Sequence, residues 1–456
     1  MEIKPEIFRQ YDIRGVVGED LTPETVNLLG KGIGTLFRRH KKRDVVVGRD
    51  CRLSSPSFFE HLSKGLRSTG CDVVSLGTIP TPLLYFSIFT KNFHAGVMIT
   101  GSHNPPEFNG FKIMLGKDTL YGESITEIYK IIKNKNFIRE KPGKESNLGI
   151  NQEYEDFVVN NIKIKNKIKV VVDAGNGTGG PVAVPIFKRL GCEIIDLYCD
   201  MDGHFPNHHP DPTLPEALED LINKVKKTKA DLGISYDGDS DRIGIIDEKG
   251  NIIWGDKLMI LLCRDILPSN PGASVISEVK ASQLLYDEIK KLGGHPIMWK
   301  TGHSLIKKKI KEENAILAGE MSGHIFFADR FFGYDDAIYA SARVVEMASK
   351  SNQTLSEMLS DLPQTFTTPE IRIYSSDKVK FKIVEEVKRE LSKKYKVIDI
   401  DGVRAIFPKG WGLVRASNTQ GALVLRFEAQ TKEDLESIKT EVEETIEKAI
   451  RRISES

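Results

Sequence analysis

The stretch from Lys169 to Leu197 decides the fold and reads KVVVDAGNGTGGPVAVPIFKRLGCEIIDL. It starts with an apolar strand, continues into a helix with a basic end, passes Gly191 and finishes in a second apolar strand. Short apolar strands that alternate with helices are typical of parallel or mixed sheets covered by helices. This part of the chain is therefore predicted to be an α/β unit.

Two other segments repeat the same order. One starts with the strand Asp44 to Gly48 and the other with Ala273 to Ile276, and each reaches a glycine, Gly70 or Gly293, after its helix. Together with Gly191, these glycines recur at intervals of about a hundred residues, the size of a small domain. Three related α/β domains with mixed sheets are predicted, and ligands of such sheets bind at the carboxyl ends of the strands.

The C-terminal segment, from about Thr368, follows a different pattern. A strand and a basic helix are followed by two strands and a long last helix, which indicates an α+β unit. We expect these elements at 370–374, 378–395, 403–407, 422–428 and 432–452. The predicted domain boundaries are 1–149, 150–250, 251–366 and 367–456.

The composition excludes several classes of protein. Among the 456 residues, 65 lysines and arginines nearly cancel 64 aspartates and glutamates, so no net field favours nucleic acid or a membrane surface. No apolar run approaches the roughly 18 residues of a transmembrane helix, and the first residues lack the apolar core of a signal peptide. The five scattered cysteines show no CxxC spacing, so we expect reduced packing residues in a cytoplasmic protein.

The sharpest local motif is Thr100-Gly-Ser-His-Asn-Pro-Pro-Glu-Phe-Asn-Gly-Phe-Lys112. It follows the apolar stretch Ala95 to Ile99, so a strand delivers Ser102 into a loop bounded by glycine and proline. A hydroxyl held in this way, beside His103 and with Lys112 downstream, could carry a transferable phosphoryl group. The alternative is that Ser102 only caps the loop as an ordinary turn residue.

A second motif is Asp237-Gly-Asp-Ser-Asp-Arg242, between two apolar stretches that read as strands. Three carboxylates at alternate positions can converge only if something neutralises them, and oxygen ligands favour Mg²⁺ over Zn²⁺. An EF-hand does not fit, because no glutamate closes a loop of 12 residues. The alternative is an acidic turn, although Arg242 indicates that an anion also binds here.

Two weaker motifs complete the set. In Gly319-Glu-Met-Ser-Gly-His324, Glu320 and Ser322 project to one side of an extended loop and could bind adjacent sugar hydroxyls. In the run Arg415 to Thr419, an arginine fork and short polar side chains could curl round a phosphate. Each motif alone also fits an ordinary turn.

Taken in order, these motifs resemble the α-D-phosphohexomutase family, in its phosphomannomutase/phosphoglucomutase branch. The resemblance covers essentially the whole chain. It is carried by the three motifs from Ser102, Asp237 and Glu320 onward and by Phe8–Gly15, Val47–Asp50, Asp173–Gly177, Lys300–Ile306 and Arg415–Thr419.

The resemblance implies four domains round a central cleft, the last of the TATA-binding-protein-like type. It implies that Ser102 carries the phosphoryl group and that Asp237, Asp239 and Asp241, with the Ser102 phosphate, bind one Mg²⁺ per chain. The other catalytic residues it implies are Arg14, His103, Lys112 and His303. The substrate-binding residues it implies are Tyr11, Arg242, Lys280, Glu320, Ser322, His324, Arg415, Ser417, Asn418 and Thr419.

By the same resemblance, the expected reaction moves a phosphoryl group between O1 and O6 of mannose and glucose phosphates, through phosphoserine and a hexose 1,6-bisphosphate. Alternatives are a phosphoglucosamine mutase, a serine-dependent sugar phosphatase and a non-catalytic sugar-phosphate-binding protein. The partners expected are small hexose phosphates, without nucleic acid or membrane, and the sequence leaves monomer or dimer open. Ser240 replaces the glycine usual in the family's DGDGDR motif, and little consequence is expected.

Overall fold

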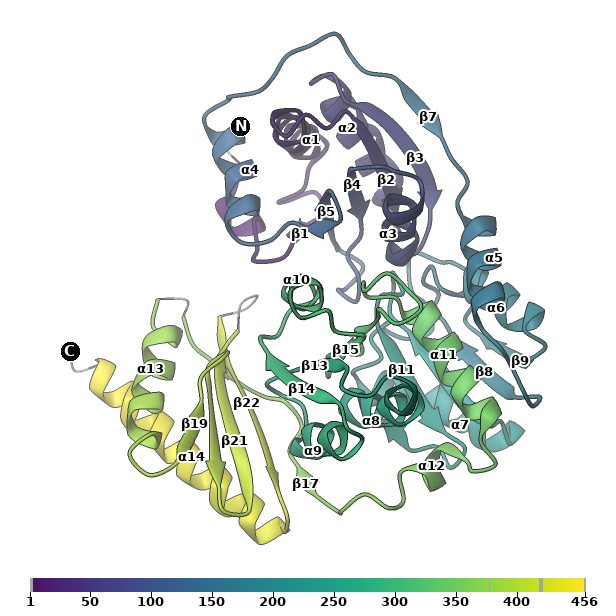
Figure 1. Cartoon of the computed structure of the whole chain (residues 1–456). Coiled ribbons are helices and arrows are strands. Elements are labelled where there is room, and N and C mark those ends of the chain that lie inside the picture. Colours follow the sequence, from purple (N-terminus) through teal and green to yellow (C-terminus); the bar gives the residue numbers. More distant parts are fainter. Residues whose placement is uncertain (1–2, 377, 418–420, 455–456) are drawn as a thin grey trace.

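The computed structural model describes residues 3–376, 378–417 and 421–454, which form four units that each contain one sheet (Figure 1). We call them domains 1 to 4 in chain order. The prediction of α/β domains with mixed sheets and an α+β C-terminal domain is confirmed.

Domain 1 contains a sheet in the order β1-β5-β4-β2-β3-β7, with β6 beside β5. Strands β2, β3, β4 and β7 are parallel, whereas β5 runs antiparallel to β4 and β1. The strands are β1 (Ile13–Val16), β2 (Asp44–Arg49), β3 (Asp72–Thr78), β4 (Ala95–Ile99), β5 (Phe108–Leu115), β6 (Asp118–Thr119) and β7 (Glu145–Asn147). The helices are α1 (Pro23–Arg39), α2 (Ser55–Arg67), α3 (Thr81–Thr90) and α4 (Glu123–Lys133).

Domain 2 has the sheet order β12-β11-β10-β8-β9, with a parallel core and β11 antiparallel to β10. Its strands are β8 (Lys169–Asp173), β9 (Glu193–Leu197), β10 (Leu232–Tyr236), β11 (Ile243–Asp247) and β12 (Ile252–Ile253). Its helices are α5 (Asn151–Asn161), α6 (Gly180–Arg189) and α7 (Glu219–Thr228).

Domain 3 repeats the plan with the order β14-β13-β15-β16, and β16 is antiparallel to β15. Its strands are β13 (Ser274–Glu278), β14 (His295–Trp299), β15 (Leu317–Gly319) and β16 (Ile325–Phe327). Its helices are α8 (Gly255–Ile266), α9 (Gln283–Lys291), α10 (His303–Glu313), α11 (Ala337–Lys350) and α12 (Leu355–Met358).

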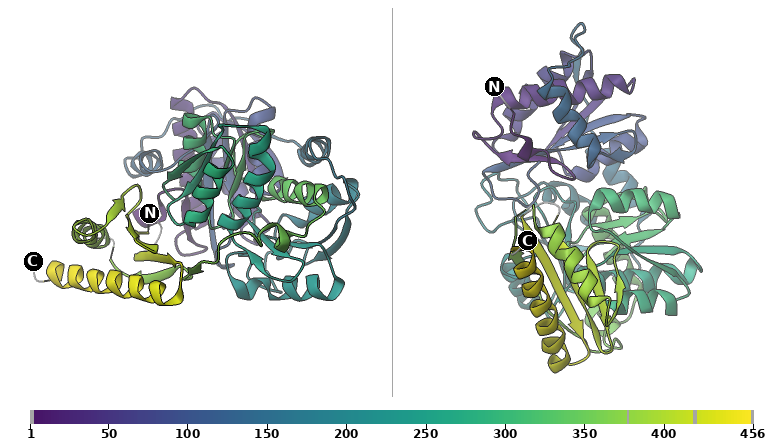
Figure 2. Two further views of the ribbon diagram at one scale, coloured as in Figure 1. Left: turned by 60° about the horizontal axis from the view of Figure 1, so that its bottom comes forward. Right: turned by 90° about the vertical axis from the view of Figure 1, so that its left-hand side faces the viewer.

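Domain 4 is an antiparallel sheet with two helices on one face, while the other face looks toward domain 3 (Figure 1). Both further views place α14 on the outside of the molecule (Figure 2). The strands are β17 (Phe366–Thr367), β18 (Ile371–Tyr374), β19 (Lys396–Ile398), β20 (Val403–Phe407), β21 (Gly410–Ala416) and β22 (Ala422–Ala429). The helices are α13 (Lys380–Leu391) and α14 (Lys432–Ser454).

Strand β21 is not among the expected strands, and its last residues, Arg415 and Ala416, belong to a run that is expected to curl round a phosphate. Its residues Trp411 and Leu413 face domain 3, whereas Val414 packs under the helices, so the strand is buried on both faces. Its two glycines weaken the strand pattern, but Gly412 lies against Phe427, and a Cβ there would come within 3.0 Å of that ring.

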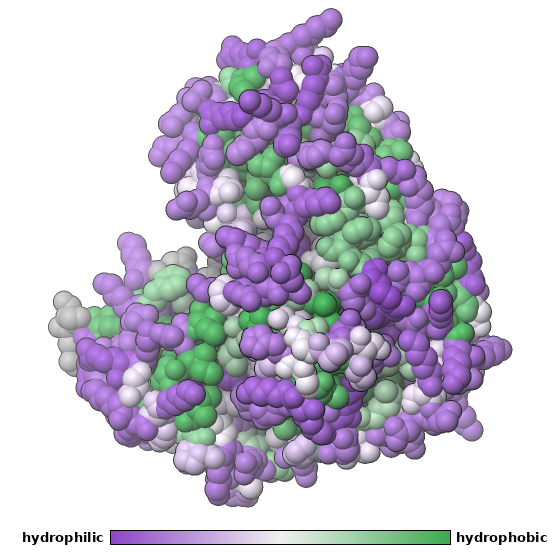
Figure 3. Space-filling model, viewed as in Figure 1, coloured by the Kyte–Doolittle hydropathy of each residue, from purple (hydrophilic) through white to green (hydrophobic). Residues whose placement is uncertain are grey.

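One hydrophobic cluster runs through domains 1, 2 and 3, each of which also has a separate cluster of its own, and domain 4 has its own core. One cluster of buried side chains joins Leu83 of domain 1, Ile234 of domain 2 and Tyr339 of domain 3. Domain 4 has its own core and meets domain 3 through the small cluster of Val279, Trp411 and Leu413. The surface is hollowed between domain 1 and domain 4 (Figure 3).

Candidate active site

The predicted motifs of domains 1, 2 and 3 occupy equivalent places in their domains, and the fourth motif follows a strand of the antiparallel sheet of domain 4. In domains 1, 2 and 3 each loop joins a parallel strand to the antiparallel strand beside it: β4 to β5, β10 to β11 and β15 to β16. In domain 4 the run from Arg415 leads from β21 toward β22. The repeat predicted from the sequence therefore brings equivalent loops to a common centre.

Ser102 lies at this centre, 4% exposed, and its side chain reaches across from domain 1 to domain 2. Its Oγ donates to Asp237 Oδ2 at 2.8 Å and lies 3.1 Å from His103 Nδ1. The backbone at Ser102 has a φ of +49°, a conformation that costs free energy for any residue except glycine. Backbone strain of this kind persists where the surrounding structure fixes a functional side chain.

Arg52, which the sequence analysis missed, holds the serine loop in this shape. It is 1% exposed, and its guanidinium donates to four carbonyl oxygens of the loop. These belong to Ser102 at 2.8 Å, Asn104 at 2.5 Å, Pro105 at 2.7 Å and Phe108 at 3.0 Å. A local sequence pattern cannot predict this role, because the carbonyl groups that Arg52 binds lie about fifty residues further along the chain.

The aspartate cluster is buried. Oxygens of Asp237, Asp239 and Asp241 lie within 4.8 Å of one another, and all three residues are 0% exposed. Lys112 Nζ donates to Asp239 at 2.7 Å and also to Asp241. Burial raises the pKa of Asp237, and the two neighbouring carboxylates raise it further. Although burial acts in the same direction on Asp241, Lys112 and His324 hold its pKa well below the ordinary value.

These carboxylates fit a hard divalent cation. The three carboxylates converge within 4.8 Å, and one oxygen of Asp239 has no hydrogen-bond partner among the described residues. A site made only of oxygens is the kind that Mg²⁺ prefers.

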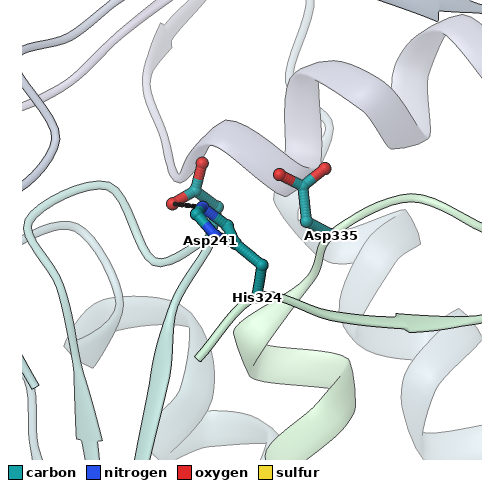
Figure 4. A group of neighbouring side chains, drawn as sticks. All are labelled: Asp241, His324 and Asp335. Atoms are coloured by element: carbon teal, nitrogen blue, oxygen red, sulfur yellow. Dashed lines mark ion pairs between the residues drawn. The ribbon is translucent and has the colours of Figure 1, made fainter. Parts of the chain in front are cut away.

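A second group of ligand-type residues, Asp241, His324 and Asp335, is better explained by ion pairs (Figure 4). His324 Nε2 lies 3.4 Å from Asp241, and Asp335 accepts from Lys307 at 2.8 Å. Burial lowers the pKa of His324, but Asp241 and Glu320 together raise it to about 9. The ion pairs with Asp241 and Glu320 and the pair between Asp335 and Lys307 account for the closeness of these side chains.

Three further basic groups near Ser102 are one neutral histidine and two arginines. Burial lowers the pKa of His103 well below its ordinary value, and Arg242 and Arg14 lower it further, so His103 is neutral. Arg14 projects from β1 beside β5, the strand of Lys112, and is held by Asp12 at 2.5 Å. Arg242 Nε lies 3.4 Å from His324 Nε2.

The loop Gly319–His324 of domain 3 is held by hydrogen bonds to its neighbours. Glu320 Oε1 accepts from the Gly302 amide at 2.7 Å, and its other oxygen lies 3.1 Å from His324 Nδ1. Ser322 Oγ is 2.9 Å from the same nitrogen. His303, the first residue of α10, stacks on His324 with ring centres 5.5 Å apart.

The remaining predicted residues gather where domains 1, 3 and 4 meet. Tyr11 Oη donates to the Thr301 carbonyl at 3.0 Å. Lys280 lies 3.4 Å from Glu278 and 3.2 Å from Glu370. Arg415 and Ser417 are both 6% exposed. Asn418 and Thr419 lie outside the described residues.

Three further residues lie here, and only Thr301 belongs to a motif quoted from the sequence. Glu278 ends β13 and binds the Thr301 hydroxyl and the Met321 amide, the latter at 3.0 Å. Asp335 lies 3.3 Å from His303 Nδ1. Thr301 lies within the Lys300–Ile306 motif, so its place in the site could have been suspected.

Comparison with known proteins agrees with this architecture. The family models for phosphoglucomutase/phosphomannomutase match in all four parts: alpha/beta/alpha domain I at 5–139, domain II at 152–250, domain III at 254–366 and the C-terminal domain at 369–445. A phosphomannomutase/phosphoglucomutase of Pseudomonas aeruginosa is 48% identical over 435 residues, covering 95% of this chain and 94% of its own.

Two further relatives extend the likeness. A phosphoglucomutase of Neisseria meningitidis is 45% identical over 449 residues, covering 98% of this chain and 97% of its own. The crystal structure of a phosphoglucomutase/phosphomannomutase family protein from Burkholderia thailandensis matches with a TM-score of 0.93 at 40% identity, covering 98% of each chain. The chain therefore belongs to the phosphoglucomutase/phosphomannomutase family.

Proposed function

We propose that this protein is a phosphomannomutase/phosphoglucomutase that moves a phosphoryl group reversibly between O1 and O6 of mannose and glucose phosphates. The observation that carries the proposal is the 2.8 Å hydrogen bond from Ser102 Oγ to Asp237, inside a cluster of three buried carboxylates. A nucleophilic hydroxyl against such a cluster suits phosphoryl transfer assisted by a metal ion.

The proposed cofactor is one Mg²⁺ per chain, held by Asp237, Asp239, Asp241 and an oxygen of the Ser102 phosphate. When bound, the ion supplies positive charge against the phosphoryl oxygens. Lys112 adds a second positive charge, because its ammonium already lies against Asp239 and Asp241.

In the proposed reaction, a hydroxyl of the hexose phosphate attacks the phosphorus of phosphoserine 102. The new bond joins phosphorus to the sugar oxygen, the bond to Ser102 Oγ breaks, and the hydroxyl proton leaves to a basic group. The product is a hexose 1,6-bisphosphate, which must reorient before its other phosphoryl group returns to Ser102. We assign Arg14, His103, Lys112 and His303 to proton transfer and to the charge of the transition state.

The rest of the site is proposed to hold the sugar phosphate in both orientations. Glu320 and Ser322 bind hydroxyls through short acceptors and donors, with His324 and Arg242 beside them. The distal phosphate binds Tyr11, Lys280, Arg415, Ser417, Asn418 and Thr419. The same proposal includes a cytoplasmic location and the domain bounds 1–149, 150–250, 251–366 and 367–456.

None of the described helices is both long and apolar enough to cross a membrane, and all five cysteines are free thiols. Free thiols are usual in the reducing cytoplasm, which supports the proposed location.

The deciding experiment follows the conversion of glucose 1-phosphate and mannose 1-phosphate to the 6-phosphates, with and without a catalytic amount of glucose 1,6-bisphosphate. We expect activation by the bisphosphate, conservation of total sugar phosphate and loss of activity on Ser102→Ala. Mass spectrometry should find one phosphoryl group on Ser102 after priming. Release of inorganic phosphate in proportion to turnover would identify a phosphatase instead, and preference for glucosamine 1-phosphate in the same assay would identify a phosphoglucosamine mutase.

Metal dependence is tested in the same assay. Dialysis against a chelator should abolish turnover, and Mg²⁺ should restore it. Asp239→Asn should need more Mg²⁺ for half-maximal activity, because the ion loses one charged ligand. Full activity after exhaustive chelation would contradict the proposed role of the cluster.

A further inference from the structure

Asp401 lies in the turn between β19 and β20, and its carboxylate joins two domains through a single oxygen. Oδ2 accepts from the Thr301 amide of domain 3 at 3.1 Å and from Arg415 Nε of domain 4 at 3.0 Å. Arg415 Nη2 lies 3.0 Å from the same oxygen. The side chains of Asp401 and Arg415 are 14% and 7% exposed, so solvent screens this pair only weakly.

The backbone is shaped to bring Asp401 to this place. The next residue, Gly402, has a φ of +85°, and a Cβ there would lie 2.4 Å from the Val414 carbonyl oxygen and 2.6 Å from Arg415 Cβ. Only glycine fits a turn pressed so closely against β21. The turn therefore places the Asp401 carboxylate over the guanidinium of Arg415.

The Thr301 amide, which binds Asp401, belongs to a segment that several other hydrogen bonds hold in place. The Thr301 carbonyl accepts from Tyr11 of domain 1 at 3.0 Å, and its hydroxyl donates to Glu278 of domain 3. The next amide, of Gly302, donates to Glu320. Residues of domains 1 and 3 therefore hold the Thr301 peptide in place, and its amide in turn holds the Asp401 carboxylate.

The contact with Asp401 fixes the orientation of the Arg415 guanidinium. A guanidinium is a planar fork with five N–H donors. Asp401 takes the edge made by Nε and Nη2, which sets the plane, and no described residue accepts from Nη1, so its donors remain for a ligand. A fork already held in one orientation loses less conformational freedom when it binds phosphate.

We infer that Asp401 is a positioning residue for the phosphate site: through it, the Thr301 loop of domain 3 orients Arg415 of domain 4 toward the distal phosphate of the substrate. The inference rests on the proposed function, in which Arg415 binds that phosphate. Because the distal phosphate stays bound while the other one reacts, its contacts stabilise ground state and transition state alike. Loss of Asp401 should therefore act on KM more than on kcat.

The test compares Asp401→Asn with Asp399→Asn in the full-length enzyme, assayed with glucose 1-phosphate and the bisphosphate activator. Asp399 belongs to the same segment but pairs with Lys388 at the surface, where its side chain is 59% exposed. We expect Asp401→Asn to raise KM about tenfold, the loss expected for one charge-assisted hydrogen bond, while kcat falls much less. Asp399→Asn should match the wild type, and Asp401→Glu, which keeps the charge, should recover part of the loss.

Two further measurements separate positioning from other roles. In an Arg415→Lys background, Asp401→Asn should change KM less than twofold, since a lysine has no fork to orient. In a Ser102→Ala background, calorimetry with glucose 1-phosphate should report the same loss of affinity without any chemistry. Three results would overturn the inference. The effects of Asp401→Asn and Arg415→Lys on KM could multiply, or the KM of Asp401→Asn could equal that of the wild type. Asp401→Asn could also bind glucose 1-phosphate more tightly, which would show that Asp401 competes with phosphate for Arg415.

Failure of the inference is distinct from failure of the proposed function. If the wild type shows no mutase activity when primed with bisphosphate, the proposed function fails. If the wild type is active and Asp401→Asn keeps its KM, only the positioning role of Asp401 fails.

Discussion

Single residues show where the chain accepts strain or buried charge to build the site. Ser240 stands between the aspartates with a φ of +61° and is 0% exposed. Its hydroxyl has no hydrogen-bond partner among the described residues. The sequence suggested little consequence for a serine here, but the backbone requires a conformation that glycine adopts without strain.

Ser240→Gly is therefore expected to stabilise the protein. It removes about 1–2 kcal/mol of backbone strain and a buried hydroxyl without a hydrogen-bond partner. Both effects stabilise the folded state. They exceed the ~0.4–1 kcal/mol by which the flexibility of glycine stabilises the unfolded chain. We expect the free energy of unfolding to rise by about 1 kcal/mol in urea denaturation. The matched control is Ser235→Gly in extended strand β10, which should lose about 1 kcal/mol. Equal losses in both variants would refute the strain argument.

A second residue-scale prediction concerns the pH dependence of stability. His208 Nε2 lies 3.1 Å from both oxygens of Asp173, and Nδ1 lies 2.9 Å from the His209 carbonyl oxygen, so acceptors face both nitrogens. Burial lowers the pKa of His208, but Asp173 outweighs it and the net pKa is raised above 6.5. This stabilisation is complete below the unfolded pKa of about 6.5 and is lost as pH rises through the higher folded pKa.

His208→Gln should therefore flatten this part of the stability profile. Urea unfolding between about pH 6 and pH 9 should show a smaller decline in the variant than in the wild type. An identical slope in both proteins would mean that His208 is not charged in the folded state.

At the scale of elements, helices α1 and α2 of domain 1 approach each other at glycines. A Cβ on Gly65 would lie 2.3 Å from the Asn27 carbonyl oxygen, and one on Gly30 would lie 2.4 Å from the Leu62 carbonyl oxygen. Backbone atoms of neighbouring helices cannot move aside as flexible side chains do. The contact therefore depends on residues without a side chain.

Gly65→Ala is expected to destabilise domain 1 by about 2 kcal/mol, even though alanine favours helices, because the overpacked contact must open. The measurement is thermal or urea unfolding. Lys64→Ala, on the exposed face of the same helix, should change stability by less than about 0.5 kcal/mol. A stabilised Gly65→Ala variant would show that the helices can separate without cost.

For the whole molecule, the main division lies between domain 4 and the rest. Domains 1, 2 and 3 share one hydrophobic cluster, whereas domain 4 is joined through a small cluster and polar contacts. Arg404, 0% exposed, is central to this joint: Nη1 donates to the carbonyl oxygens of Val279 at 2.6 Å and Ala281 at 2.8 Å. Its guanidinium lies 3.7 Å from the centre of the Trp411 ring.

Arg404→Met should loosen domain 4 while its own core stays intact. Two carbonyl groups lose their donor, so the attachment is expected to weaken by about 3 kcal/mol. Calorimetry should then resolve a separate, lower transition for domain 4, and proteolysis of the segment before β17 should become faster. Lys396→Met, on exposed β19, serves as the control. One cooperative transition at the wild-type temperature would contradict this role for Arg404.

The sequence by itself determined the repeated α/β pattern, the α+β C-terminal unit and the motifs that hold Ser102, the aspartates and Glu320. These features are local, because strand periodicity and glycine-bounded loops arise from neighbouring residues. Strand β21 escaped the sequence analysis because its burial depends on Phe427 and on domain 3.

Only the tertiary structure decided which groups act on one another over long distances in the chain. Arg52 binds four carbonyls of the serine loop, Lys112 of domain 1 lies against aspartates of domain 2, and Asp401 binds both Thr301 and Arg415. The physical reason is that a buried charge is stabilised by whichever partner the fold brings within a few ångströms. Residue spacing along the chain does not encode that partner.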